Sequence, residues 1–324
     1  MDNLTHSLVG WALGEAGLKG KSRKGLAALV LGANMPDLDV FFGHSCWVPL
    51  ATHRGFTHSL VGGMVVMPPL LFALLWLLDR WQVRRGATFR SGLELRPGWL
   101  LALCFIGALT HPLLDWQTSY AIQLFSPFSD HWFHAESLFI IDVWLWCVLG
   151  TGIFLSRRRA GRGESRPAPA RAALVLGLAY ILGNQLLTYS AKEALRTNPP
   201  YPRPEILFAQ FEPVRFWERG LVWREEGRIG FARWSPFFTL EQVAAPAADN
   251  MEDPAVRRAL EATPQIRRFM RWSVMPMAQV TRAGCMARVE LTDARFASIR
   301  VPWRGDGNPF RHVVQVPTGE AGCR

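Results

Sequence analysis

Long apolar runs limit what this chain can fold into more than any other feature of its sequence. Four runs approach the length of about 20 residues that a helix needs to cross a bilayer. They are 59–79, 97–115, 137–155 and 172–190. We expect four membrane spans, the first of them kinked at Pro68 and Pro69. Two shorter apolar stretches, 3–18 and 25–36, are expected to form a helical hairpin that dips in from one side or packs inside the bundle.

The apolar runs and seven of the eight histidines lie in residues 1–195, whereas residues 196–324 are rich in arginine and proline. The predicted fold class is therefore mainly α. A helical integral-membrane domain that binds metal (1–195) precedes a small α+β or mostly β soluble domain (196–324). The stretch NPPYPRP (198–204) is expected to be a stiff linker between them.

Alternating apolar and β-branched residues predict strands in the C-terminal part at 219–235, 286–300 and 312–317. In the first of these, turns are expected at Gly220, Gly227 and Gly230. Residues 252–272 favour a short helical region, which Pro254 and Pro264 limit. Cys285 and Cys323 could form a disulfide if this domain faces an oxidising compartment.

Along the chain, loops rich in lysine and arginine alternate with loops that contain almost none. The loops 19–24, 80–96 and 156–171 are rich in lysine and arginine, whereas Arg54 is the only lysine or arginine in 35–58 and 116–136 contains neither. The positive-inside rule places the three basic loops in the cytoplasm and the rest, with the C-terminal domain, outside. The net charge of +10 does not indicate a nucleic-acid-binding protein, because many of the basic residues lie in short loops beside the membrane. Basic residues in such loops are typical of contact with anionic lipid headgroups.

This topology brings one set of polar residues to a single membrane face, the extracytoplasmic one. The set is His6, Asp37, Asp39, His53, His58, His111 and Asp115. Ionisable groups at a bilayer are costly unless they pair, bind a ligand or stay hydrated. Histidine and carboxylate ligands without thiolates suit a catalytic Zn site, with Mn and Fe as alternatives. The sequence therefore predicts a site for one or two divalent ions.

Each group in this set also has a structural interpretation. His111 and Asp115 are four residues apart on one helical face, which suits one metal, or a hydrogen-bonded pair that ties helices together. Asp37 and Asp39 would point the same way on an extended backbone, although either could cap a helix. His6 could be a satisfied histidine at a helix end.

In HRGFTHS, the stretch from His53 to Ser59, His53 is expected on a loop and His58 in the first turn of the span. Arg54 could hold an anion, and Thr57 or Ser59 could cap the helix. A hydrated loop histidine is the alternative for His53.

Four more polar residues are weaker candidates. His131, His134 and Glu136 could bind metal or substrate, or could belong to an interfacial aromatic belt. Asp142, inside the predicted 137–155 span, could orient the metal ligands without binding the metal itself.

Four stretches resemble the YdjM family of bacterial inner-membrane proteins, which are described as metal-dependent hydrolases. They are Thr5-His6-Ser7, Pro36-Asp37-Leu38-Asp39, HRGFTHS and GALTHPLLD (107–115), with Pro127 beyond them. The resemblance covers roughly residues 1–155. It implies a metal site formed by His6, Asp37, Asp39, His53, His58, His111 and Asp115. The order of these residues is also similar to that in zinc-dependent phospholipases C, although the later HxxxE ligand pair of those enzymes is absent.

The resulting hypothesis is a membrane-bound metal-dependent hydrolase of phosphoester or ester bonds in a lipid or envelope substrate. A metal-activated water would attack, Asp37 or Asp39 would act as base, and Arg54 would steady the anion. Membrane lipids and an amphiphilic or phosphoester substrate are the expected partners. The alternative is a non-enzymatic metal-binding protein, either a transporter or an envelope stress factor. Transport would predict broken helices in paired halves, and no internal repeat is apparent.

Overall fold

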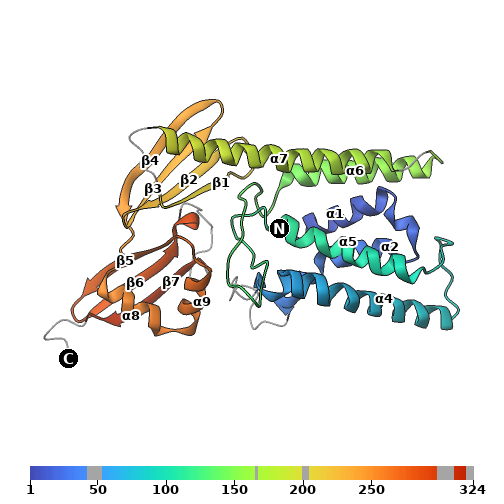
Figure 1. Cartoon of the computed structure of the whole chain (residues 1–324), viewed down its shortest axis with the longest axis horizontal. Coiled ribbons are helices and arrows are strands. Elements are labelled where there is room, and N and C mark those ends of the chain that lie inside the picture. The colour runs from blue at the N-terminus through green and yellow to red at the C-terminus, as the bar shows by residue number, and fades with distance from the viewer. Residues whose placement is uncertain (42–52, 165–166, 199–203, 298–309, 319–324) are drawn as a thin grey trace. The chain divides into compact units, whose positions relative to one another are not determined.

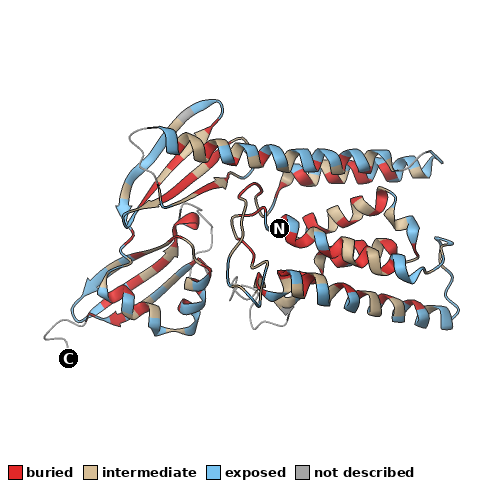
Figure 2. Ribbon diagram, viewed as in Figure 1, coloured by how far each residue is buried: buried red, intermediate tan, exposed pale blue. Residues whose placement is uncertain are grey.

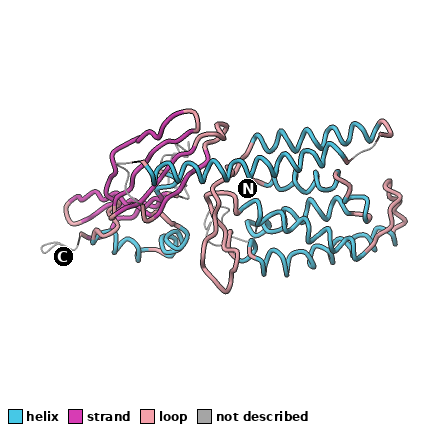
Figure 3. The backbone as a smooth tube through the Cα atoms, turned by 45° about the horizontal axis from the view of Figure 1, so that its top comes forward, coloured by secondary structure: helices cyan, strands magenta, loops and turns pink. Residues whose placement is uncertain are grey.

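A computed structural model of the chain describes residues 1–41, 53–164, 167–198, 204–297 and 310–318. The described residues form two compact units, one made of residues 1–41 and 53–185 and the other of the described residues from 186 onward (Figure 1). The first unit is helical and the second contains the strands (Figure 3). Helix α7, Ala168–Thr197, contributes to both units.

The first unit consists of helices that run up and down beside one another. They are α1 (Asn3–Glu15), η1 (Leu18–Lys21), α2 (Gly25–Asn34), η2 (Met35–Phe41), η3 (Phe56–His58), η4 (Leu60–Val66), α4 (Met67–Arg84), α5 (Pro97–Asp115), α6 (Val143–Gly161) and the first part of α7. The short pair α1 and α2 forms the expected hairpin, and α2 packs against both α1 and α5. The hairpin therefore packs inside the bundle.

Glycines allow these helices to approach closely. A Cβ atom added at Gly10 of α1 would lie 2.7 Å from the Leu29 carbonyl oxygen, and one added at Gly107 of α5 would lie 2.5 Å from the same atom. Leu29 itself is fully buried, together with Leu100 and Leu103 of α5. Backbone contact on both sides of α2 thus fixes the position of this helix, and η2, which follows it directly, carries Asp37.

Three helical segments are long and apolar enough to cross a membrane: Leu60–Arg84, Pro97–Asp115 and Ala168–Thr197. Exposed leucines cover the outer faces of α4 and α7, as Figure 2 shows in pale blue. The other expected span, 137–155, corresponds to α6, which starts later at Val143 and ends with Arg157, Arg158 and Arg159. Those three charged residues within α6 distinguish it from the three segments that are apolar enough to span a membrane.

The first span begins in an unexpected way. Leu60–Val66 forms a π-helix that Ser59 caps by accepting a hydrogen bond from the Gly62 amide, 3.0 Å away. Pro68 and Pro69 then occupy the first turn of α4, where a missing amide donor costs little. The prolines thus mark a change of helix type, which the sequence predicted only as a kink.

The second unit contains two antiparallel sheets. One has the order β1-β2-β3-β4, from β1 (Ile206–Phe211), β2 (Arg219–Glu225), β3 (Arg228–Ser235) and β4 (Phe238–Ala248). The other has the order β5-β6-β7, from β5 (Pro276–Ala283), β6 (Met286–Asp293) and β7 (Arg311–Pro317), with η5 (Ala294–Phe296) after β6. Ala191 and Leu195 of α7 pack on the first sheet.

The expected turn at Gly227 is present between β2 and β3, but the turns expected at Gly220 and Gly230 are wrong. Gly220 lies inside β2. Gly230 pairs with Trp223 across the sheet, and a Cβ added there would lie 2.3 Å from the indole ring. This glycine therefore makes room for a tryptophan and does not form a turn.

The helical region is α8 (Pro254–Ala262) followed by α9 (Pro264–Trp272), so the two prolines begin helices, as their fixed φ angle favours. The expected linker lies mostly outside the described residues, and α7 continues to Thr197 just before it. Cys285 is a disulfide cysteine, whereas Cys323 lies outside the described residues.

Candidate metal centre

His6 comes from the first turns of α1. Asp2 begins this helix by accepting hydrogen bonds from the amides of Leu4 and Thr5 at 2.9 and 3.1 Å. The Thr5 hydroxyl in turn accepts a hydrogen bond from the Trp146 indole, 2.8 Å away. These contacts fix the rotation of α1, so that the His6 ring faces inward and stacks on His111 with 3.9 Å between ring centroids.

Asp37 and Asp39 lie on the 3₁₀ helix η2, so the extended backbone expected here is wrong. The two carboxylates nevertheless both reach histidines. Asp37 Oδ1 lies 3.2 Å from His58 Nε2, and Asp39 Oδ1 lies 2.7 Å from His53 Nδ1. The continuous path from α2 into η2 positions them directly at the end of the buried helix.

Thr57 links the two histidines of HRGFTHS. Its hydroxyl donates to Asp39 Oδ2 at 2.6 Å and lies 3.1 Å from His58 Nδ1. Because the single hydroxyl proton points to Asp39, His58 Nδ1 donates to Thr57, which leaves Nε2 of His58 with a free lone pair. His58 ends η3, a separate 3₁₀ helix before the span begins at Leu60, so its expected position in the first turn of the span is wrong; His53 precedes η3.

His111 and Asp115 share one face of α5, with 3.5 Å between Nε2 and Oδ2, as the spacing predicted. Pro112 leaves α5 continuous. His111 Nδ1 donates to the Ala33 carbonyl at 2.7 Å, so its Nε2 also carries the lone pair. A backbone carbonyl behind a histidine is the usual arrangement that orients a metal ligand.

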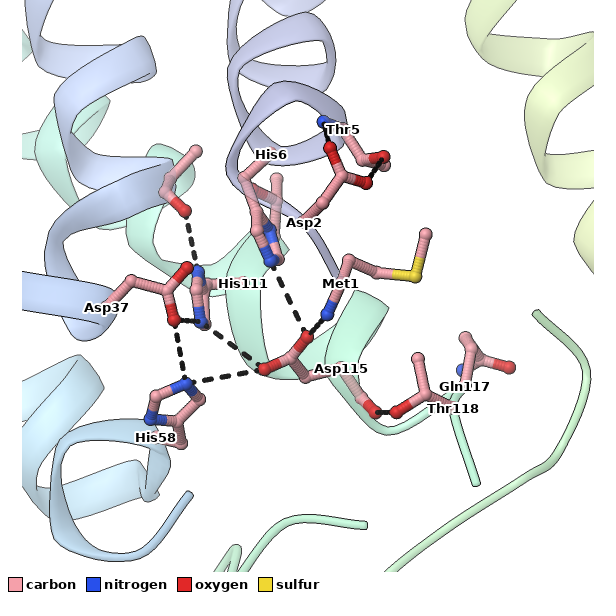
Figure 4. Close-up of polar contacts among 12 residues, drawn as sticks. Met1, Asp2, Thr5, His6, Asp37, His58, His111, Asp115, Gln117 and Thr118 are labelled. Carbon is pink, nitrogen blue, oxygen red and sulfur yellow. Dashed lines mark hydrogen bonds and ion pairs between the residues drawn. The ribbon is translucent and has the colours of Figure 1, made fainter. Parts of the chain in front are cut away.

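Five of these side chains converge on one small volume, shown in Figure 4: His6, Asp37, His58, His111 and Asp115. Asp115 Oδ2 lies 3.3 Å from His58 Nε2, and Asp115 Oδ1 lies 3.5 Å from His6 Nε2. Asp37 Oδ1 lies 3.5 Å from His111 Nε2. Neighbouring ligands of a four-coordinate zinc with bonds of about 2.0–2.2 Å stand roughly 3.4 Å apart. The spacing of these atoms fits ligands around an ion.

Burial sets the protonation of these groups. The side chains of His6 and His58 are inaccessible to solvent, and burial lowers the pKa of both well below the usual value. Burial opposes ionisation of Asp37, but the nearby His111 and His58 outweigh it and hold the pKa of this carboxyl well below its usual range. Neutral imidazoles beside a carboxylate are the protonation states that a metal requires.

Among the described residues, several nitrogen and oxygen atoms of this cluster lack a hydrogen-bond partner. They are both ring nitrogens of His6, Nε2 of His111 and Oδ2 of Asp115. Buried polar atoms without a partner are rare and costly. An ion would satisfy one ring nitrogen of His6 together with the His111 and Asp115 atoms, so the residues fit the divalent metal that the sequence predicted. Three overlapping ligand groups satisfy the geometry: His6–His111–Asp115, Asp37–His58–His111 and Asp39–His53–His58.

The three groups differ in accessibility. Side chains of His6, His58, His111 and Asp115 are at most 1% exposed, whereas those of His53 and Asp39 are 22% and 18% exposed. The cluster therefore has a closed inner part and an outer part that solvent reaches beside His53.

Arg54 is more buried than a residue that holds an anion at the surface would be, because it is only 2% exposed. Its Nη1 atom lies 3.4 Å from Asp115 Oδ2 and donates to the Thr118 hydroxyl at 3.2 Å. The guanidinium thus adds positive charge directly at the edge of the ligand cluster.

The weaker candidates lie outside the three ligand groups found among the described residues. His134 Nδ1 pairs with Glu136 Oε1 at 2.7 Å, and the His131 ring contacts Phe133. Asp142 caps α6 by accepting from the Leu145 amide and the Tyr180 hydroxyl. It precedes its helix, so its expected position inside a span is wrong.

Sequence reasoning did not assign site contacts to Thr57, Thr118 or the Met1 amino group, which contacts Asp115 Oδ1. Thr57 adjoins His58, and Thr118 follows Asp115 by three residues, just after α5 ends. That adjacency is the only signal the sequence offers for these contacts.

A family model described as "YdjM inner membrane protein" matches residues 1–191. The match covers more than half of the chain and includes every residue of the three ligand groups. No curated protein and no solved structure matches the chain.

Proposed function

The chain belongs to the YdjM inner membrane protein family, and from that premise we propose that it is a membrane-bound, metal-dependent hydrolase. The observation that carries this proposal is the convergence of His6, Asp37, His58, His111 and Asp115, with nitrogen-to-oxygen distances of 3.2–3.5 Å. The unpartnered ring and carboxylate atoms in the same cluster support it.

One or two divalent ions, zinc by the choice of ligands, would be held by the inner and outer parts of the cluster. His6, His111 and Asp115 form the inner ligand group, and Asp39, His53 and His58 the outer one, with Asp37 between them. A bound ion would supply Lewis acidity and make a water molecule nucleophilic near neutral pH.

The chain's own side chains would do the remaining work. Asp39, whose side chain is 18% exposed, is the carboxylate nearest solvent and so the base to which a proton could pass, whereas the low pKa of Asp37 suits that carboxylate to binding the ion. Thr57 holds Asp39 in place through its 2.6 Å hydrogen bond. Arg54 would steady the negative charge that develops on the substrate while it also orients Asp115.

The position of the cluster favours a substrate from the membrane. It lies where α2 ends, where the first span begins and where α5 ends, next to the exposed side chains of Leu38, Phe56 and Leu60. An amphiphilic phosphoester or ester could place its polar group at His53 and its chains along these apolar residues. Nucleic acid is not an expected substrate.

We further propose that the cluster and the second unit are extracytoplasmic. Within the first unit, Arg23 pairs with Asp79 and Lys24 bonds Gln82, so two of the basic loops meet at the opposite end of the helices from the cluster. The positive-inside rule puts that end in the cytoplasm. A disulfide cysteine at position 285 suits an oxidising compartment.

The test begins with metal analysis of the purified protein, followed by hydrolysis of a panel of lipid phosphoesters, lipid esters and soluble phosphoesters. We expect turnover of at least one amphiphilic substrate by the metal-loaded protein and none by Asp115→Ala. Equal turnover by both proteins would contradict the proposal. Bound metal without turnover of any substrate would favour the non-enzymatic alternative.

A further inference from the structure

The end of the first sheet in the second unit is unusually apolar for a soluble surface. The strand register places two connections at this end. Arg219 pairs with Phe211 on one side and with Trp234 on the other, and Ser235 pairs with Phe238. The loop 212–218 and the turn 236–237 therefore lie side by side at the end of the sheet.

Both connections expose apolar side chains. Phe237 is 78% exposed, Val214 58% and Phe238 42%. The half-buried Phe216 and Trp217 in the first connection add two rings with 5.2 Å between their centroids. Neighbouring apolar side chains that are exposed on a soluble surface are typical of an interaction site. The exposed side chains at this end of the sheet therefore point to an apolar partner.

Helix α7 identifies that partner. Arg219 donates from Nε to the Thr188 hydroxyl at 3.0 Å, so this end of the sheet is fixed beside Thr188. The neighbouring helix residues Leu186 and Tyr189 are 65% and 62% exposed. They end a stripe of exposed apolar residues on α7 that starts at Val175. The first charged residue after it is Lys192.

The length of α7 places Tyr189 near the membrane boundary. Its 30 residues extend about 45 Å at about 1.5 Å per residue, whereas the hydrocarbon core is about 30 Å thick. The helix therefore leaves the bilayer before it ends, and the change from Tyr189 to Lys192 marks that level. The apolar end of the sheet, fixed beside Thr188, therefore lies next to the part of α7 that meets this level.

We propose that Val214, Phe237 and Phe238 insert into the interfacial layer of the lipid bilayer beside the outer end of α7. Aromatic side chains are favoured at this depth because their rings replace water with acyl chains and headgroups. The ion pair of Arg215 with Glu218, 3.0 Å apart in the same loop, stays at headgroup level. The second unit is thereby held on the membrane surface by lipid contact as well as by α7.

The full-length protein in nanodiscs of phosphatidylcholine and phosphatidylglycerol tests this proposal. A benzophenone amino acid replaces Phe237, and lipid adducts are quantified after illumination. Met286, 41% exposed on β6 of the other sheet, is the matched control position. We expect at least about fivefold more lipid adduct at position 237 than at position 286, because only the first position contacts the bilayer.

Equal adduct yields at the two positions would overturn the proposal. Adducts between two chains at position 237, in place of lipid adducts, would also overturn it and would identify a second copy as the partner. Positions 214 and 238 repeat the measurement, so that one variant that fails to fold does not decide the outcome. Folding of each variant is checked by its elution as a single species.

Discussion

The Nε2 atom of His58 lies 3.2 Å from Oδ1 of Asp37, at the point where the first span begins and the buried helix α2 has just ended. Burial lowers the pKa of His58, and the histidines around Asp37 hold the pKa of that carboxyl low, so the pair combines a neutral imidazole with a carboxylate. The pair therefore carries one net negative charge, which suits a cation between its two atoms.

His58→Ala is therefore expected to lose most of the bound metal, because His58 belongs to two of the three ligand groups. Metal content per chain, measured by mass spectrometry of the purified protein, gives the result. His134→Ala is the matched control, since His134 pairs with Glu136 outside those groups and should keep full metal content. Similar metal loss in both variants would indicate general unfolding.

The inner and outer parts of the cluster should respond differently to substitution. His111→Ala removes a ligand shared by two groups and should leave the protein without metal. His53→Ala removes only the exposed outer ligand, 22% accessible, and should leave about one ion per chain with strongly reduced hydrolysis. Identical metal content in the two variants would mean that the inner and outer parts do not bind separately.

Arg54→Lys tests the proposed charge role of the guanidinium. Lysine keeps the positive charge but cannot contact Asp115 and Thr118 together in the same planar geometry. We expect metal content to be unchanged and kcat to fall by about 10²–10³-fold, the usual loss when one oxyanion donor is removed. A parallel loss of metal would show instead that Arg54 acts by positioning Asp115.

Much of this centre could be predicted from sequence because it depends on local spacing and on topology. The interval from His111 to Asp115 fixes a shared helical face, and the alternation of basic loops brings His6, Asp37 and His58 to the same end of the helices. Neither inference requires knowledge of side-chain packing. In the structure, His6, His58 and His111 all lie within 3.5 Å of Asp115, and Asp37 lies 3.2 Å from His58.

The contacts that the sequence did not predict depend on tertiary packing. Arg54 was expected to hold an anion, but the approach of α5 brings Asp115 and Thr118 to its side chain. Gly230 has the composition of a turn residue, and only the cross-strand position of Trp223 explains it. The three arginines at the end of α6 were assigned to a loop, although the helix continues through them.

The second unit offers a test of stability that is independent of metal. Asp293 and Arg295 are fully buried, with 2.8 Å between Oδ1 and Nε, and Asp293 also accepts from the Ser273 hydroxyl. Asp293→Asn leaves the guanidinium buried without its counter-charge and should lower the free energy of unfolding by about 3–5 kcal/mol. Denaturant unfolding followed by tryptophan fluorescence measures the change.

Asp253→Asn is the control for this variant. Its partner Arg282 is 47% exposed, and asparagine still caps α8, so the change should stay within about 1 kcal/mol.

The stability of the second unit should also depend on pH through Asp293. Burial opposes ionisation of Asp293, but Arg295 outweighs it and lowers the pKa of the carboxyl. The stability that the ionised Asp293 carboxylate contributes is therefore fully present above the unfolded pKa of about 3.9. It is lost progressively as the pH falls from that value through the lower pKa of the folded state.

The orientation of the protein can be tested with a reporter fused after Arg324. An enzyme that is active only outside the cytoplasm should be active in this fusion, because the basic loops are expected to remain inside. A reporter that is active only in the cytoplasm would reverse the orientation while leaving the cluster itself intact.

The most direct test of the central claim compares metal content in two variants that each remove one buried carboxylate. Asp115 is contacted by three histidines and Arg54, whereas Asp79 is equally buried but pairs with Arg23 at the other end of the helices. The account predicts that Asp115→Asn purifies without metal and that Asp79→Asn retains the wild-type amount. Wild-type metal content in Asp115→Asn would contradict it.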